Sequence, residues 1–231
     1  MMVDFNSPYY PYEKVQTGFN SLKGAENLPN QLIMYLLDLP DKNGYEPVDD
    51  NSRPRVRLIK YIYYDSENPL AEPLPTPEQK LSLLYDGTNP DINTDEDKLN
   101  HPDRYRIYGQ QYEMQSMTKA KTILRCFMAR EIPRSANKTI LGIDFECIVH
   151  YALEGNMKSG VESRMYAIHQ CLVEALNGVN MSGIGTVMYD KRVHGDAGYS
   201  LYHTEGSAVY SDTFFGIDWQ ETTTEETIPS W

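Results

Sequence analysis

A long apolar strand followed by an amphipathic helix constrains the fold more than any other part of this sequence. The stretch "KTILGIDFECIVHYALE", residues 138–154, is rich in β-branched and aromatic residues, and we interpret it as one long strand. In "ESRMYAIHQCLVEALNG", residues 162–178, the apolar side chains recur with the spacing of one helix face (Met165, Ile168, Leu172, Ala175 and Leu176). Gly178 follows where a C-terminal cap belongs. The sequence therefore predicts a strand and then a helix.

Two more strands are predicted beyond this helix, at residues 183–191 ("GIGTVMYDK") and 208–219 ("AVYSDTFFGIDW"). They flank a polar, glycine-punctuated loop at residues 192–207. A pair of strands around a loop predicts an antiparallel hairpin, and hence an α+β class. The loop is longer than a hairpin needs, which predicts an assembly element.

The first half of the chain gives weaker signals. Residues 113–131, "EMQSMTKAKTILRCFMARE", predict a second helix that ends at Ile132-Pro133, because apolar residues follow a helical spacing (Met117, Ala120, Leu124, Phe127 and Met128). The remaining predictions are short strands at 55–65, 80–87 and 104–112, a proline-rich extended connector at 66–79 and an acidic loop at 88–103. Together these predict an antiparallel sheet packed by two main helices, with extended N- and C-terminal arms.

We divide the chain into three parts. Residues 1–52 are predicted to form an extended N-terminal arm and a short helix, residues 53–219 an α+β domain that forms rings, and residues 220–231 a C-terminal tail. The alternative for the N-terminal arm is a disordered terminus.

The composition limits the function. A net charge of −12 over 231 residues repels phosphate, so general nucleic-acid binding is disfavoured, although DNA could slide past such a surface without sticking. Three cysteines without framework spacing fit a reducing compartment. With neither a signal segment nor a membrane-length apolar run, we expect a soluble protein that is intracellular or assembled inside a cell.

Four residues resemble a zinc site: Cys147, His150, His169 and Cys171. Cys147 and His150 are three apart on a predicted strand, so they point to opposite faces. His169 and Cys171 are separated by about 200° on a helix. Neither pair can chelate one ion, and we expect no metal and no cofactor. Cys147 is interpreted as a buried apolar residue, and His169 as a hydrogen-bonded histidine at the edge of the apolar stripe.

Other catalytic patterns are weak. Asp144 and Glu146 lie on one face of the long strand, as in some metal-dependent nucleases, but position 148 is Ile where such sites usually have Lys. Gly183-x-Gly185 leads into a strand and so lacks a phosphate-binding helix N-terminus. We interpret three other acids as turn or loop residues (Asp86, Asp196 and Asp212). We therefore predict a protein that is not an enzyme and has no catalytic residues.

Charge is unevenly distributed along the chain. Basic residues gather between Arg104 and Lys138, whereas residues 91–97 and 221–226 are acidic. The basic segment is either a solvated helix face or a surface complementary to an acidic neighbour, such as another copy. The polar tail ends in Trp231, a large aromatic that could anchor into another subunit.

Several stretches resemble virion neck proteins of crAss-like tailed bacteriophages: "PRVRLIKYIYYD", "PLPTPEQKLSLLYDG", "SRMYAIHQCLVEALNGVNMSGIGTVMYD" and "VHGDAGYS". The resemblance covers most of residues 53–219. The C-terminal half is also similar to tail-completion and head–tail connector proteins, which have a strand, a helix with an early Arg, and a hairpin with an aromatic-rich last strand. Here Arg164, the helix to Asn177 and "FFGIDW" at 214–219 supply that order.

The resemblance implies a tail-completion-like fold and a structural virion protein that forms a homo-oligomeric ring in the neck between portal and tail. Its partners would be other copies, the portal and adjacent neck or tail proteins, with double-stranded DNA passing non-specifically through the lumen and no membrane. Its location would be the head–tail interface of the virion, after assembly in the host cytoplasm. The alternatives are a metal-dependent nuclease that uses Asp144 and Glu146, and a monomeric adaptor that binds a peptide at a sheet edge.

Overall fold

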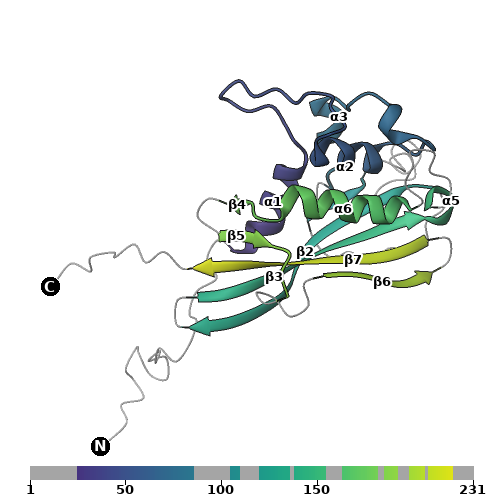
Figure 1. Ribbon diagram of the computed structural model, residues 1–231. Coiled ribbons are helices and arrows are strands. Elements are labelled where there is room, and N and C mark those ends of the chain that lie inside the picture. The colour runs from purple at the N-terminus through teal and green to yellow at the C-terminus, as the bar shows by residue number, and fades with distance from the viewer. Residues whose placement is uncertain are drawn as a thin grey trace, which may run out of the picture.

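A mixed sheet with its long strands in the middle forms the frame of the protein (Figure 1). The computed structural model describes residues 25–85, 105–109, 120–135, 138–154, 163–181, 185–191, 198–205 and 208–220. The strands are β1 (Ile107–Tyr108), β2 (Thr122–Ser135), β3 (Lys138–His150), β4 (Asn180–Met181), β5 (Gly185–Met188), β6 (Gly198–Glu205) and β7 (Ala208–Gln220). Their order is β1-β2-β3-β7-β5-β4, and β6 also pairs with β7. Every pairing is antiparallel except that of β1 with β2.

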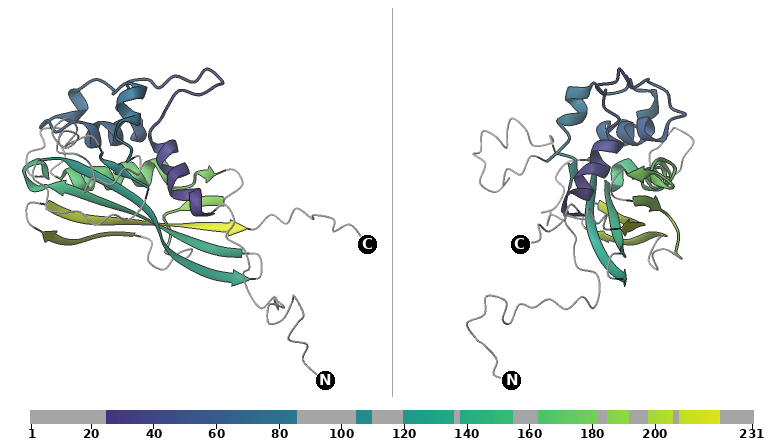
Figure 2. Two further views of the ribbon diagram at one scale, coloured as in Figure 1. Left: turned by 180° about the vertical axis from the view of Figure 1, so that it is seen from behind. Right: turned by 90° about the vertical axis from the view of Figure 1, so that its left-hand side faces the viewer.

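The helices gather on one face of this sheet (Figures 1 and 2). They are η1 (Ala25–Asn27), α1 (Leu28–Leu36), α2 (Pro54–Tyr63), η2 (Pro69–Ala71), α3 (Pro77–Leu81), α5 (Tyr151–Glu154) and α6 (Arg164–Leu176). None of these helices is long and apolar enough to cross a membrane. The observed class is compatible with the predicted α+β.

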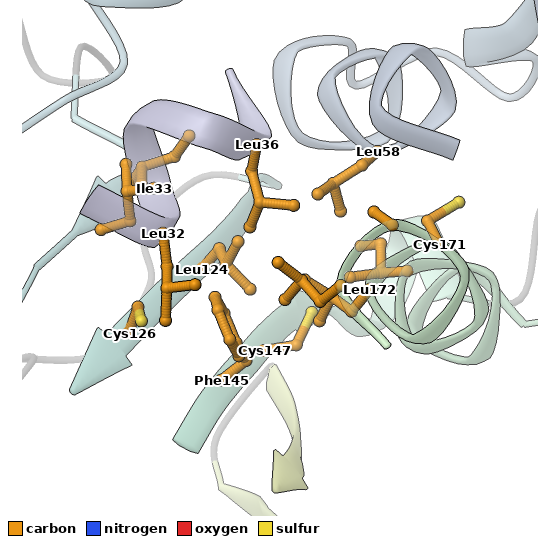
Figure 3. Close-up of a cluster of buried hydrophobic side chains, with 14 of the residues drawn as sticks. Leu32, Ile33, Leu36, Leu58, Leu124, Cys126, Phe145, Cys147, Cys171 and Leu172 are labelled. Atoms are coloured by element: carbon orange, nitrogen blue, oxygen red, sulfur yellow. The ribbon is translucent and has the colours of Figure 1, made fainter. Parts of the chain in front are cut away.

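The main core lies between the helices and the sheet. Figure 3 shows Leu32 and Leu36 of α1, Leu58 of α2 and Leu172 of α6 converging on Phe145 of β3. Phe145 meets Phe215 of β7 edge to face, with the ring centroids 5.8 Å apart. On the other face, a smaller cluster joins the first strands to the start of β7 (Tyr108, Ile123, Ile148 and Ala208). Because β3 is covered on both faces, it is buried from Thr139 to Val149.

The predicted strand at 55–65 is wrong, because these residues form α2. Composition favoured a strand, but the buried side chains of Val56, Ile59 and Ile62 recur with a helical period of three. Pro54 occupies the first turn, where its missing N–H is tolerated. Tertiary packing against α6 and the sheet therefore outweighs β propensity here.

The predicted helix at 113–131 is also wrong from Lys121 onwards, because Thr122–Ser135 is β2. Residues 122–126 are buried on both faces of the sheet, so they lack the alternation of buried and exposed side chains that marks a strand. The period of such a buried run does not distinguish a strand from a helix. Pro133 does not end the element; it sits in a strand that has its second neighbour, β1, only at Leu124 and Arg125. Residues 113–119 lie outside the described part.

The proline-rich connector and the strand predicted at 80–87 give short helices instead. Residues 69–71 form η2, and α3 begins at Pro77 behind a capping box made by Thr76 and Gln79. Leu84 makes only an isolated bridge to Ile107. β1 confirms the extended piece predicted within 104–112. The acidic loop at 88–103 lies outside the described residues.

The C-terminal half agrees better with the sequence. β3, α6, β5 and β7 lie where they were predicted, except that residues 151–154 form the short helix α5. Gly178 follows α6 with φ +85°, as a cap requires. The predicted antiparallel pairing of β5 with β7 is confirmed, but the two strands do not form a simple hairpin, because β6 lies between them in the chain and also pairs with β7. The predicted loop at 192–207 is wrong in its second half: residues 198–205 are β6.

The described residues exclude 1–24 of the predicted N-terminal arm and 221–231 of the predicted C-terminal tail. Within residues 25–52, α1 buries Leu28, Leu32 and Leu36 in the main core. Of the two main helices predicted over the sheet, α6 is confirmed, whereas α1 and α2 take the place of the helix predicted at 113–131.

Candidate functional site

Three carboxyl groups gather on the sheet face opposite the helices. Asp144 and Glu146 are two apart on β3, so they share one face, as predicted, while Phe145 between them enters the main core. Asp212 of β7 lies directly opposite Glu146 in the ladder. Asp212 is therefore not the turn residue that we expected, and it belongs to a strand that carries its side chain to the other two acids.

Burial controls the protonation of this carboxyl cluster. Asp144 is only 5% exposed. Burial, with the charges of Asp212 and Glu146 adding to it, raises the pKa of Asp144 to about 8. Burial, together with the charge of Glu146, raises the pKa of Asp212 to about 6, although the hydrogen bond with Asp144 opposes this shift. At neutral pH, Asp144 therefore keeps its proton and Asp212 is charged.

The third acid is already paired. Arg125 of β2 donates from Nη1 to Oε2 of Glu146 over 2.5 Å, and both side chains are buried. Two atoms of the cluster are buried without a hydrogen-bond partner, Oδ1 of Asp144 and Nε of Arg125. The arrangement can hold a proton between the two aspartate carboxyls, and it pairs the third acid, Glu146, with arginine.

The Cys–His quartet is distributed over separate environments. Cys147 of β3 and Cys171 of α6 are buried in the main core, where Figure 3 shows them among leucines. Burial raises the pKa of Cys171 to about 12 and that of Cys147 well above its ordinary value, so both thiols stay protonated. His150 lies at the end of β3, where its Nδ1 accepts a hydrogen bond from the N–H of Ala152. Among the described residues, no group of three or more His, Cys, Asp or Glu side chains could hold a metal ion.

His169 has the hydrogen bond that was predicted for it. Its Nδ1 lies 3.1 Å from the hydroxyl of Thr213 on β7, and burial lowers the pKa of the imidazole. Three tyrosine rings surround it, with centroids 4.4 Å (Tyr199), 5.6 Å (Tyr166) and 5.7 Å (Tyr189) away. This aromatic cluster is not predicted from the sequence, because residues 192–207 are expected to form a loop, whereas Tyr199 lies in β6.

Arg164, the early arginine of α6, is a structural residue. Its guanidinium is fully buried and donates to the carbonyl oxygens of Tyr61, Tyr64 and Ser66, over 3.1, 2.7 and 2.6 Å. Tyr61 and Tyr64 lie at the C-terminal end of α2, where carbonyl groups have no partner inside the helix. Arg164 thus fastens α6 to α2.

Only some residues of the basic segment contribute to an exposed basic surface. Arg125 forms a buried ion pair with Glu146. Arg106 is also buried, and its Nη1 and Nη2 each donate to one carboxylate oxygen of Asp65 over 2.7 Å. The exposed members among the described residues are Arg130, Arg134 and Lys138, all near the turn between β2 and β3. This end of the sheet remains as the basic surface.

Comparison with known proteins adds one relationship. The family model of YomW matches residues 56–204, which is well over half of the chain. The chain belongs to the YomW family. This family is associated with bacteriophages, so the protein is phage-related. The matched region of this YomW-family protein begins in α2 and ends in β6. No curated protein and no solved structure shows significant similarity to the chain.

Proposed function

We propose that this YomW-family protein is a structural virion protein with a tail-completion-like fold, which forms a homo-oligomeric ring in the phage neck between portal and tail. The phage association of the family supports the setting, and the order of β3, α6 and the antiparallel β5–β7 pair agrees with the order that the resemblance to connector proteins implies. The neighbours would be the portal and the adjacent neck or tail proteins.

The observation that carries the proposal is a pair of unlike surfaces at opposite ends of β3. One end, near Lys138, is the basic surface just described. The other end continues into α5, where Tyr151 is 65% exposed. A strand of 13 residues is about 40 Å long. A closed ring of identical subunits needs two different, complementary patches on each copy, and this geometry supplies two that are well separated.

Exposed apolar side chains strengthen the second surface. Tyr166, in the first turn of α6, is 46% exposed, and α6 follows α5 in the chain with contacts between them. Tyrosine is favoured in subunit contacts because it combines a large apolar ring with a polar tip. The net charge of −12 suits a conduit that DNA must pass without sticking.

The test is the size and shape of the purified protein. Sedimentation and negative-stain imaging should give closed rings, alone or with portal added. Tyr151→Glu should reduce assembly without changing the circular dichroism spectrum, whereas Lys42→Glu, on an exposed loop residue, should not. A chain that stays monomeric at every concentration tried, with and without portal, would end the ring proposal.

A monomeric peptide-binding adaptor is the second candidate, because the outer edge of β2 lacks a strand neighbour over much of its described length. A monomer that binds an extended peptide would favour it. The nuclease alternative predicts magnesium-dependent DNA cleavage that Asp144→Ala abolishes.

A further inference from the structure

Within the part of the chain that the structure describes, the outer edge of β2 has a strand partner over only a short stretch. β1 pairs with β2 only at Leu124 and Arg125, and among the described residues no strand pairs with that edge from Cys126 to Ser135. Unpaired N–H and C=O groups along an edge strand are a template for another extended chain. Figure 2 shows this part of the β2–β3 hairpin running beyond the helices.

The open edge has features that make it selective. The ladder with β3 shifts register between Met128 and Arg130, and Pro133 contributes no N–H. Arg130 and Arg134 are exposed along it. Such features discourage indiscriminate pairing, and the arginines favour an acidic strand.

The sequence contains an acidic segment directly after β7 that could supply such a strand. β7 ends at Gln220, which pairs with Lys138 at the turn end of the hairpin. The next eleven residues, "ETTTEETIPSW", combine three glutamates with four β-branched threonines and an isoleucine. The open edge, residues 126–135, is of similar length.

We propose that residues 221–231 of a neighbouring copy dock on the outer edge of β2 as an added strand, with their glutamates beside Arg130 and Arg134. The occupant comes from another copy because β7 runs outward at Gln220, so its own tail would have to reverse and cross the ends of β3 and β2. This inference rests on the proposed self-assembly and names one contact between subunits, at the Lys138 end of the sheet.

Cross-linking of full-length chains tests this contact. One variant carries Ala129→Cys on the open edge, and the other carries Thr224→Cys in the tail. The native thiols, Cys126, Cys147 and Cys171, are buried and will not compete. Oxidation of the mixture should give a disulfide-linked dimer about tenfold more abundant than in a control that pairs Thr224→Cys with Lys42→Cys, because docking raises the local thiol concentration.

Charge reversal gives a second readout. Arg130→Glu combined with Arg134→Glu in the edge variant should lower the dimer yield several-fold, and Glu225→Lys with Glu226→Lys in the tail variant should restore it. A dimer yield no higher than that of the control overturns the inference. A third chain, which carries both Ala129→Cys and Thr224→Cys, is diluted into an excess of wild type, and a disulfide that forms within this one chain also overturns the inference. Rings that form without this cross-link refute the tail contact alone, and a cross-link without rings refutes the ring alone.

Discussion

The side chains of Asp144 and Asp212 are joined by a hydrogen bond between β3 and β7, on the sheet face away from the helices. Two carboxyl groups can form such a bond only if one of them carries a proton. Burial and the neighbouring negative charges favour the protonated form, and the pKa of Asp144 is about 8 in the folded chain against an ordinary value of 3.8. The folded protein therefore retains a proton that the unfolded chain releases above about pH 4.

This difference makes stability fall as the pH rises. Between pH 6 and 8 the folded state binds more protons at Asp144 than the unfolded state, so deprotonation favours unfolding. In Asp144→Asn the amide is neutral at every pH and can still donate to Asp212. As the pH rises from 6 to 8, we expect the free energy of unfolding of the variant to increase by about 1–2 kcal/mol relative to that of wild type.

Urea denaturation at a series of pH values measures this gain. Asp218→Asn removes an exposed carboxylate from the same strand and serves as the control. If the curves for wild type and Asp144→Asn run parallel from pH 6 to 8, the two carboxyls do not share a proton.

Arg164 should be the most sensitive charged residue for folding. Arg164→Met leaves three carbonyl oxygens without their donor, two at the end of α2 and one at Ser66, which should lower the free energy of unfolding by about 3 kcal/mol or more. Arg57→Met breaks a half-exposed pair with Glu174 on the same two helices and should change it by less than about 1 kcal/mol. If chemical denaturation shows equal losses of stability for Arg164→Met and Arg57→Met, the hydrogen bonds of Arg164 do not hold α6 against α2.

The strand and helix of the C-terminal half could be predicted because their signals are local. In α6 the apolar stripe and Gly178 indicate the same element, and the structure adds Ser163 as its N-terminal cap. In β2 the signal misleads, because burial on both faces removes the alternation that marks a strand. Residues 55–63 form a helix and not a strand because they pack against α6, and this long-range contact cannot be read from a local pattern.

The candidate site was only half visible for a similar reason. Asp144 and Glu146 share a face by the alternation of one strand, so the sequence is sufficient to pair them. Asp212 and Arg125 join them only through the registers of β7 and β2 with β3, and these long-range registers cannot be read from one sequence.

The cysteines should be unreactive in the folded protein. Burial raises the pKa of Cys126, Cys147 and Cys171, and a protonated, inaccessible thiol is a poor nucleophile. We expect a thiol reagent to modify none of the three until denaturant is added, and elemental analysis to find no stoichiometric zinc. Cys147→Ala should lower stability by about 1 kcal/mol. Rapid modification without denaturant, or one equivalent of bound metal, would contradict the buried assignment.

Gly185 should tolerate no side chain, because β5 and β7 approach closely at this point. Its φ is +144°, and a Cβ placed there would lie 2.3 Å from the carbonyl oxygen of Asp218, a backbone atom that cannot swing away. Gly185→Ala should therefore displace β5 from β7 and lower the free energy of unfolding by about 2–4 kcal/mol. Gly44 is the matched control: its φ is +87°, but a Cβ would meet nothing within 4 Å, so Gly44→Ala should lower stability by about 1 kcal/mol through backbone strain alone. Thermal and chemical denaturation of the two variants measures the difference. If Gly185→Ala is no worse than Gly44→Ala, the close contact of β5 with β7 does not exist in solution.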